Sequence, residues 1–315
     1  MKMSLVVNFI LKFPIISHFR MRRPITIKLE QERLDSIRVI EKSYRIGRFS
    51  IELSPGHLLH HYQSVHPFYN KFPLFIAKYL PGGTDVIQVG ANVGDTLALM
   101  VSGNDTLNFF CIEADSGFFD FLRTNIETMH TFCKFEVEAI NKMVAQEINF
   151  KGLEGSNGTK KGVEATPGDD VLETVSLDKL FESREILNVS LLMVDVDGFD
   201  FDVIKSAQKI IEQFSPILYF EVTPLNEGTT EKYLELMENL ELLGYLHWSV
   251  FDNFGNLMLN DVTREIAAQV LTYSHLQNLG KGTRTIYYLD IYCSTEKYRE
   301  EYENSITKYR EFMMK

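Results

Sequence analysis

Acidic side chains follow three of the apolar segments in this sequence that have the length and composition of buried strands. They are Glu113, Asp195 and Glu221, and Asp197 lies two residues beyond Asp195. A core strand requires no charge at its end. Carboxylates there could accept hydrogen bonds from ligand hydroxyls, remove a proton from a reacting hydroxyl, or bind a divalent cation. Their placement predicts a ligand site to which several strands contribute.

A glycine-rich turn precedes these carboxylates. Within 85–96, a short apolar strand leads into Gly90, Asn92 and Gly94, and an apolar helical run follows. Gly90 lets backbone approach a ligand closely, and Asn92 tolerates positive φ. Gly94 opens a helix whose free N–H groups would face the ligand. The G-x-N-x-G spacing differs from the G-x-G-x-x-G of dinucleotide-binding turns, and it favours S-adenosylmethionine (SAM) over NAD.

Each carboxylate has a predicted role and a simpler alternative. Glu113 ends the strand after the turn, where it could accept both hydroxyls of a ribose or be a surface carboxylate. Asp195 and Asp197 are the predicted catalytic pair. They could position the ammonium of the cofactor, deprotonate a hydroxyl, or hold Mg²⁺, for which they are the candidate ligands. Alternatively, Asp197 or Asp200 caps the following helix.

Histidines cluster before the glycine-rich turn. The spacing of His57, His60 and His61, with His66 nearby, could place them around a metal, although such residues are more often half-exposed on a helix. His57 follows a Pro-Gly turn and is the member that we expect to contact substrate. Glu221, at the end of a later strand, is the second predicted substrate contact.

The elements that must position these residues alternate from residue 85 onward. Continuous apolar strands between amphipathic helices predict an α/β fold, with a doubly wound, mostly parallel seven-stranded sheet and a late antiparallel hairpin strand. We expect an N-terminal extension over 1–47 and one domain over 48–315. That domain would begin with lead-in helices at 48–84 and end with a C-terminal helix at 294–315.

A polar excursion interrupts this alternation at 150–170. It is rich in Gly, Asn, Thr and Lys around 155–162, which suits many hydrogen bonds to hydroxyls. We expect the excursion and the lead-in segment to cover the carboxyl ends of the strands, where an acceptor must enter. The predicted acceptor is a small molecule or glycan, either a glycan precursor or a nucleotide sugar, rather than a flat aromatic compound.

Composition restricts the partners. The net charge of −11 argues against nucleic acid, which requires a basic face. Three separated cysteines suit a reducing compartment, and we expect a cytoplasmic protein. No stretch approaches the roughly 20 apolar residues that span a bilayer. The basic, apolar N-terminus predicts either an interfacial membrane contact or an extension that packs or frays.

Several motifs together resemble the FkbM family of SAM-dependent methyltransferases. They are DVIQVGANVGDT (85–96), FFCIEADSGFFDFLRTNI (109–126), VEAIN (137–141), TVSLDKL (174–180), LLMVDVDGFDFDVIKSA (191–207), PILYFEV (216–222) and YYLDIYC (287–293). The resemblance implies a class I Rossmann-like fold and O-methylation of sugar or polyketide hydroxyls. The block at 56–96 also looks like members found in polysaccharide biosynthesis.

The resemblance also implies roles for individual residues. Gly90, Asn92 and Gly94 would line the methionine and ribose part of SAM, and Glu113 would bind the ribose. The residues that would border the adenine are Ala139 and Ile140. Asp195 would face the methyl-transfer region.

The chain differs from the usual family residues at three further positions. Gln88 replaces the usual Asp; it can hydrogen-bond the cofactor's ammonium but cannot neutralise it. Met193 and Asp197 replace the usual Lys and Glu. Two alternatives follow from the residues: an NAD-dependent oxidoreductase or epimerase of sugar nucleotides, and a SAM-binding scaffold without activity, which Gln88 alone favours.

Overall fold

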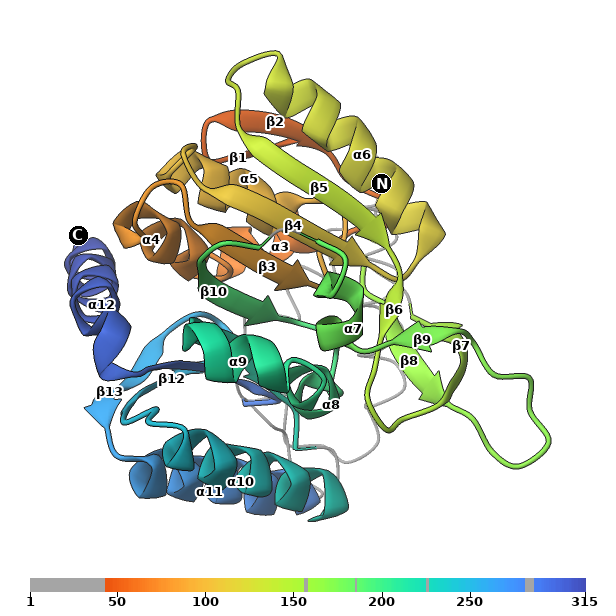
Figure 1. Ribbon diagram of the computed structural model, residues 1–315. Coiled ribbons are helices and arrows are strands. Elements are labelled where there is room, and N and C mark those ends of the chain that lie inside the picture. The colour runs from red at the N-terminus through yellow and green to blue at the C-terminus, as the bar shows by residue number, and fades with distance from the viewer. Residues whose placement is uncertain (1–42, 156–157, 185, 225–226, 281–285) are drawn as a thin grey trace, which may run out of the picture. The chain divides into compact units, whose positions relative to one another are not determined.

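The computed structural model describes residues 43–315 except 156–157, 185, 225–226 and 281–285, and residues 43–315 form one compact unit (Figure 1). Its centre is an eight-stranded sheet. The strands in spatial order are β13 (Leu257–Val262), β12 (His247–Asp252), β14 (Leu289–Ser294), β11 (Ile217–Val222), β10 (Val189–Val194), β3 (Asp85–Val89), β4 (Asn108–Glu113) and β5 (Glu136–Asn141). The N-terminal extension, and any contact that it makes with a membrane, lies outside the described residues.

Five neighbouring strands, β11, β10, β3, β4 and β5, are parallel, which confirms the mostly parallel α/β fold. The sheet has one strand more than predicted because both arms of the late hairpin, β12 and β13, join it. The antiparallel strand β14 is not at the edge. It lies between β11 and β12 and pairs with both.

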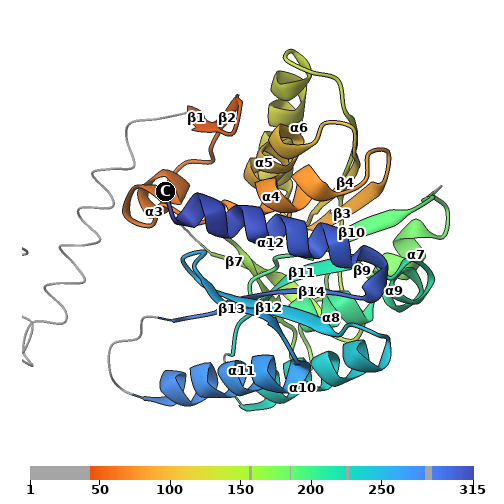
Figure 2. The ribbon, with the colours of Figure 1, turned by 90° about the vertical axis from the view of Figure 1, so that its left-hand side faces the viewer.

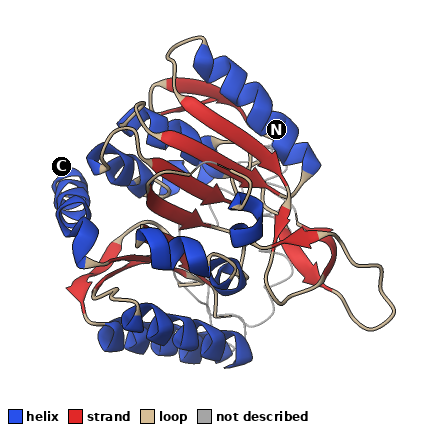
Figure 3. Cartoon of the chain, in the orientation of Figure 1, coloured by secondary structure: helices blue, strands red, loops and turns tan. Residues whose placement is uncertain are grey.

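Helices cover both faces of the sheet (Figure 3), as a doubly wound fold requires. One apolar layer contains α4 (Phe72–Tyr79), α5 (Asp95–Gly103), α6 (Ser116–His130) and α12 (Arg299–Met313). The other contains α7 (Leu177–Phe181), α8 (Asp200–Lys205), α9 (Gln208–Phe214), α10 (Glu227–Leu242) and α11 (Arg264–Leu279). Figure 2 shows α12 running across the sheet on the same side as α4, with which it is in contact. The strands β3, β10 and β11 are buried along their whole length.

Smaller elements lie outside the central sheet. The lead-in segment contains the hairpin β1 (Ser43–Ile46) with β2 (Phe49–Glu52), and helix α3 (Leu59–Val65). The polar excursion forms a second hairpin, β7 (Phe150–Glu154) with β8 (Lys161–Glu164), next to the short pair β6 (Met143–Val144) and β9 (Thr174–Val175). In Figure 1 this hairpin lies beyond the arrowheads of the central strands. No helix in the described part of the chain is long and apolar enough to cross a membrane.

Candidate active site

The turn after β3 brings backbone from two strands into close contact. Gly90, Asn92 and Gly94 all have positive φ, of 84°, 48° and 87°. A Cβ atom on Gly90 would lie 1.8 Å from the carbonyl oxygen of Asp195, so this position requires glycine for space as well as for conformation. Gly94 is the N-cap of α5. The turn and the end of β10 therefore form one unit.

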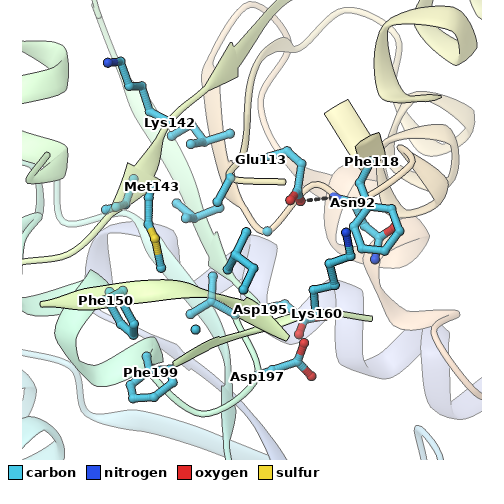
Figure 4. A pocket seen from close by; sticks show the side chains of 18 residues that line it. Asn92, Glu113, Phe118, Lys142, Met143, Phe150, Lys160, Asp195, Asp197 and Phe199 are labelled. Atoms are coloured by element: carbon cyan, nitrogen blue, oxygen red, sulfur yellow. Dashed lines mark hydrogen bonds between the residues drawn. The ribbon is translucent and has the colours of Figure 1, made fainter. Parts of the chain in front are cut away.

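Glu113 ends β4 and is buried beside this turn. One carboxylate oxygen accepts a hydrogen bond from the backbone N–H of Asn92 at 2.8 Å (Figure 4). The other accepts from the backbone N–H of Asp115 at 2.7 Å. Burial raises the pKa of Glu113, and the two backbone N–H groups oppose that rise. A carboxylate has about four acceptor sites, so Glu113 keeps capacity for ligand hydroxyls.

A cavity of about 70 Å³ lies in front of Glu113. Phe118 and Lys160 form one side, and Phe150 and Phe199, whose rings meet edge to face, form another (Figure 4). The segment 142–144, directly after β5, forms a further part of the wall. The Glu113 carboxylate together with these apolar side chains suits the ribose and adenine of a nucleoside.

Three residues predicted to bind the cofactor lie elsewhere. Ala139 and Ile140 pack in the apolar layers on opposite faces of the sheet, because β5 continues to Asn141 rather than ending at Ala139. Gln88 is buried within β3, where its Oε1 faces the Sγ of Cys111 at 3.8 Å. None of the three is among the described residues that line the two cavities at this end of the sheet.

A second cavity of about 450 Å³ lies on the other side of Asp195. Gly90, Asn92, Asp195 and Asp197 line both cavities. Asp195 is exposed to them, whereas Asp197 is half-buried and adopts φ 55°. The cavity walls keep bulk water from Asp195, which raises its pKa well above the usual range, and the neighbouring Asp197 raises it further.

The two predicted substrate contacts both line the larger cavity. Glu221 ends β11, and His57 lies just before α3. Burial lowers the pKa of His57, so its neutral form is favoured. The His57 ring packs on Gly158, where a Cβ atom would lie 2.6 Å from the ring, and the carbonyl of Gly158 accepts a hydrogen bond from Asn92 Nδ2 at 2.7 Å. The polar excursion therefore reaches the site as predicted.

The other histidines do not join His57 in the cavity wall. His66 stacks on Phe254, with ring centroids 3.8 Å apart, and the ring of His60 lies 6.3 Å from that of Tyr44. Across the described chain, no three His, Cys, Asp or Glu side chains are grouped as a metal ion would require. Whether Asp195 and Asp197 hold a metal is tested by the chelator experiment described below.

Sequence reasoning missed the far wall of the larger cavity. Asp290 on β14 stands directly opposite Glu221, and Tyr219 Oη donates a hydrogen bond to its Oδ2 at 3.2 Å. Tyr69, Tyr288 and Asn253 also line this wall. A single acidic residue within the apolar run at 287–293 was the available signal. Asp290 can be assigned to this site only when the order of the strands is known, and that order is not visible in the sequence.

The comparison with protein families assigns the central part of the chain. The model of the methyltransferase FkbM domain matches residues 88–246, just over half of the 315 residues. The match spans the glycine-rich turn, Glu113, Asp195, Asp197 and Glu221. No curated protein matches the sequence.

Solved structures of several methyltransferases are similar to this chain. An O-methyltransferase from Bacillus cereus has 10% identity over 89% of this chain and 95% of its own, with a TM-score of 0.42. Precorrin-6y C5,15-methyltransferase from Geobacter metallireducens has 9% identity over 71% of this chain and 86% of its own, with a TM-score of 0.38. The methyltransferase FkbM from Methylobacillus flagellatus has 16% identity over 44% of this chain and 32% of its own, with a TM-score of 0.33.

The family match confirms the resemblance read from the motifs and decides between SAM and NAD in favour of SAM. The chain belongs to the FkbM family of SAM-dependent methyltransferases.

Proposed function

We propose that this protein transfers the methyl group of SAM to a hydroxyl of a sugar or glycan precursor. The observation that carries the proposal is the position of Asp195 between two cavities. The smaller cavity has the nucleoside-like lining described above. The larger has room for a sugar, and most of the residues that line it carry a hydroxyl, amide or carboxyl group.

The residues around the smaller cavity fit SAM. Glu113 would accept the ribose hydroxyls, and the segment 142–144 would pack on the adenine. Gly90 and Asn92, which line both cavities, would border the methionine part. When bound, SAM supplies an electrophilic methyl group on a positively charged sulfur.

Asp195 is the proposed general base. A sugar hydroxyl is a weak nucleophile that must lose its proton as its oxygen attacks the methyl carbon. As the C–O bond forms and the C–S bond breaks, the sulfur keeps the electron pair and the proton passes to Asp195. The raised pKa of Asp195 brings its basicity closer to that of the reacting group at neutral pH. Holding the two reactants together contributes the rest of the acceleration.

The polar excursion supports a hydroxylated acceptor. Gly158 and Thr159 line the larger cavity, and Gly158 touches both His57 and the turn after β3. The backbone groups of such a loop can donate to and accept from several hydroxyls at once. The neutral ring of His57 could hydrogen-bond another.

The test is transfer of a radiolabelled methyl group from SAM to a panel of mono- and disaccharides, with the linkage identified by mass spectrometry. Asp195→Asn should reduce transfer by about 100-fold or more, because a positioned base contributes 10²–10⁴-fold. Its binding of S-adenosylhomocysteine (SAH) by calorimetry should persist. A chelator should abolish transfer, with recovery on adding Mg²⁺, only if Asp195 and Asp197 hold a metal.

Two results would contradict the proposal. SAM binding without transfer to any sugar would favour the inactive scaffold, and full activity of Asp195→Asn would remove the assigned base in both its metal-free and metal-bound forms. Asp120→Asn, at an exposed site on α6, serves as the control for a surface carboxylate.

A further inference from the structure

Two carboxylates stand directly opposite each other on neighbouring strands at the far end of the larger cavity. The antiparallel register of β11 and β14 pairs Glu221 with Asp290, and both line the cavity. Opposite residues in an antiparallel pair project from the same face of the sheet, and like charges there are destabilising. This arrangement needs a reason other than folding.

The Glu221 carboxylate has unused hydrogen-bonding capacity although it is more than nine-tenths buried. One of its oxygens accepts a hydrogen bond from the Thr223 hydroxyl, and the other has no hydrogen-bond partner among the described residues. Buried carboxylates are usually paired with a cation. Among the described side chains, Asp290 accepts a hydrogen bond only from the neutral Tyr219 hydroxyl.

The protein provides no cation at this position within its described part. The described residues that line the larger cavity include five carboxylates but no Lys or Arg. The carboxylates are Asp95, Asp195, Asp197, Glu221 and Asp290. Tyr69, Tyr219 and Tyr288 stand around the same end. Carboxylates combined with aromatic rings are the surroundings that bind an organic ammonium group.

SAM carries an ammonium group of its own, but strand order places Asp290 too far away to bind it. The methionine part of SAM is expected at the turn after β3. Strand β14 lies three strands away, behind β10 and β11. At about 4.8 Å between neighbouring strands, Asp290 is about 14 Å from the turn across the sheet. The carboxylates nearer the turn are Asp95 and Asp195.

We propose that the acceptor is an amino sugar whose ammonium group is held by Glu221 and Asp290 while one of its hydroxyls faces Asp195. This inference rests on the proposed function and names its substrate class. A nucleotide sugar or sugar phosphate fits less well, because its negative charge would meet the same carboxylates. Burial raises the pKa of Asp290 to about 7, and a bound ammonium group would lower that pKa by stabilising the ionised carboxylate.

The same contact would direct the methyl group to oxygen. An amine attacks a methyl donor through its lone pair, and an ammonium has none. Carboxylates that keep the nitrogen protonated therefore suppress N-methylation, whereas the hydroxyl near Asp195 remains free to react.

The experiment compares matched sugars on SAH-saturated protein by calorimetry. The probes are glucosamine, galactosamine and mannosamine, each beside its N-acetylated form, its neutral parent hexose and the 6-phosphate of that hexose. We expect at least one amino sugar to bind tenfold or more tightly than its three counterparts. The preference should fall to about one in Glu221→Gln and in Asp290→Asn. Both variants should keep the SAH dissociation constant within twofold, which shows that they fold, and Asp120→Asn should keep the preference.

The outcomes separate the inference from the proposed function. If neutral, N-acetylated or phosphorylated sugars bind or are methylated as well as the amino sugars, the ammonium site is wrong while O-methylation of sugars stands. Persistence of the preference in both variants would also overturn the site. If none of the sugars binds or is methylated, the proposed function fails and the inference fails with it. Methyl groups found on nitrogen would contradict the protective role of the carboxylates.

Discussion

At the scale of single residues, Gly90 joins the turn after β3 to Asp195, the proposed general base. Its φ of 84° disfavours any other residue, and the Asp195 carbonyl occupies the space of a side chain. Both requirements exclude a Cβ atom at Gly90, so the position of Asp195 depends directly on a residue in the turn after β3. This coupling explains why a strand-end carboxylate and a glycine more than 100 positions earlier form one site.

Gly90→Ala should therefore displace Asp195 as well as strain the turn. We expect weaker SAH binding by tenfold or more and a loss of stability of about 1–3 kcal/mol or greater. Gly83→Ala is the matched control, because Gly83 also has positive φ, at 75°, but a Cβ there meets nothing within 4 Å. Calorimetry and denaturant unfolding check both variants. Equal effects of the two changes would show that the close approach is unimportant.

At the scale of elements, the hairpin of β7 and β8 connects the two cavities. Lys160 forms a 2.6 Å ion pair with Asp115, and its ammonium lies 5.1 Å from the centre of the Phe118 ring. Gly158, in the connection between the two strands, contacts His57. The hairpin thus borders the smaller cavity, proposed for the cofactor, through Lys160 and the larger cavity, proposed for the acceptor, through Gly158.

Gly158→Ala should separate these two roles. Its φ is 95°, and the new methyl group would press on the His57 ring. We expect the KM for the sugar acceptor to rise fivefold or more, with the SAH dissociation constant changed less than twofold. Gly168→Ala, in the same excursion with φ 100° and open space around it, controls for backbone strain. A matching rise in KM in the control variant would assign the effect to strain rather than to His57.

Most of the elements could be predicted from the sequence because periodicity and glycine placement are local signals. The ends of the strands and their order could not. Ala139 is an inner residue of β5, because pairing of Glu113 with Asn141 continues that strand by two residues. The helical segment 200–214 is divided into α8 and α9 around Ser206, whose Oγ accepts a hydrogen bond from the N–H of Leu177. Such contacts join residues distant in the chain.

At the scale of the whole molecule, strand order brings together the carboxylates whose placement costs stability. Because β14 is inserted beside β11, Asp290 joins Glu221 and Asp195 at one end of the sheet. Asp195 and Asp200 raise the pKa of Glu221 beyond the effect of its burial. The repulsion between these carboxylates lowers stability, and the rest of the fold must offset it.

The cost in stability of these carboxylates can be measured at Asp290 through its dependence on pH. Its pKa rises from 3.8 unfolded to about 7 folded, chiefly through burial, so the native state holds a proton that the unfolded chain has released. Stability contributed by that proton is present below pH 3.8 and is lost as the pH rises toward 7. Asp290→Asn removes this loss, and an Asn side-chain oxygen can still accept the Tyr219 hydroxyl.

Asp290→Asn should accordingly stabilise the protein at pH 8 by about 1–4 kcal/mol, since one pKa unit corresponds to 1.36 kcal/mol. At pH 5 this gain should be clearly smaller than at pH 8, because only part of the stability carried by the raised pKa is lost between pH 3.8 and pH 5. Urea unfolding at the two pH values, without sugar or cofactor, provides the comparison, and Asp120→Asn should show no such difference. If Asp290→Asn changes stability equally at pH 5 and pH 8, Asp290 does not carry a raised pKa. The same variant loses the preference for amino sugars under our inference, so a gain in stability would accompany a loss in binding.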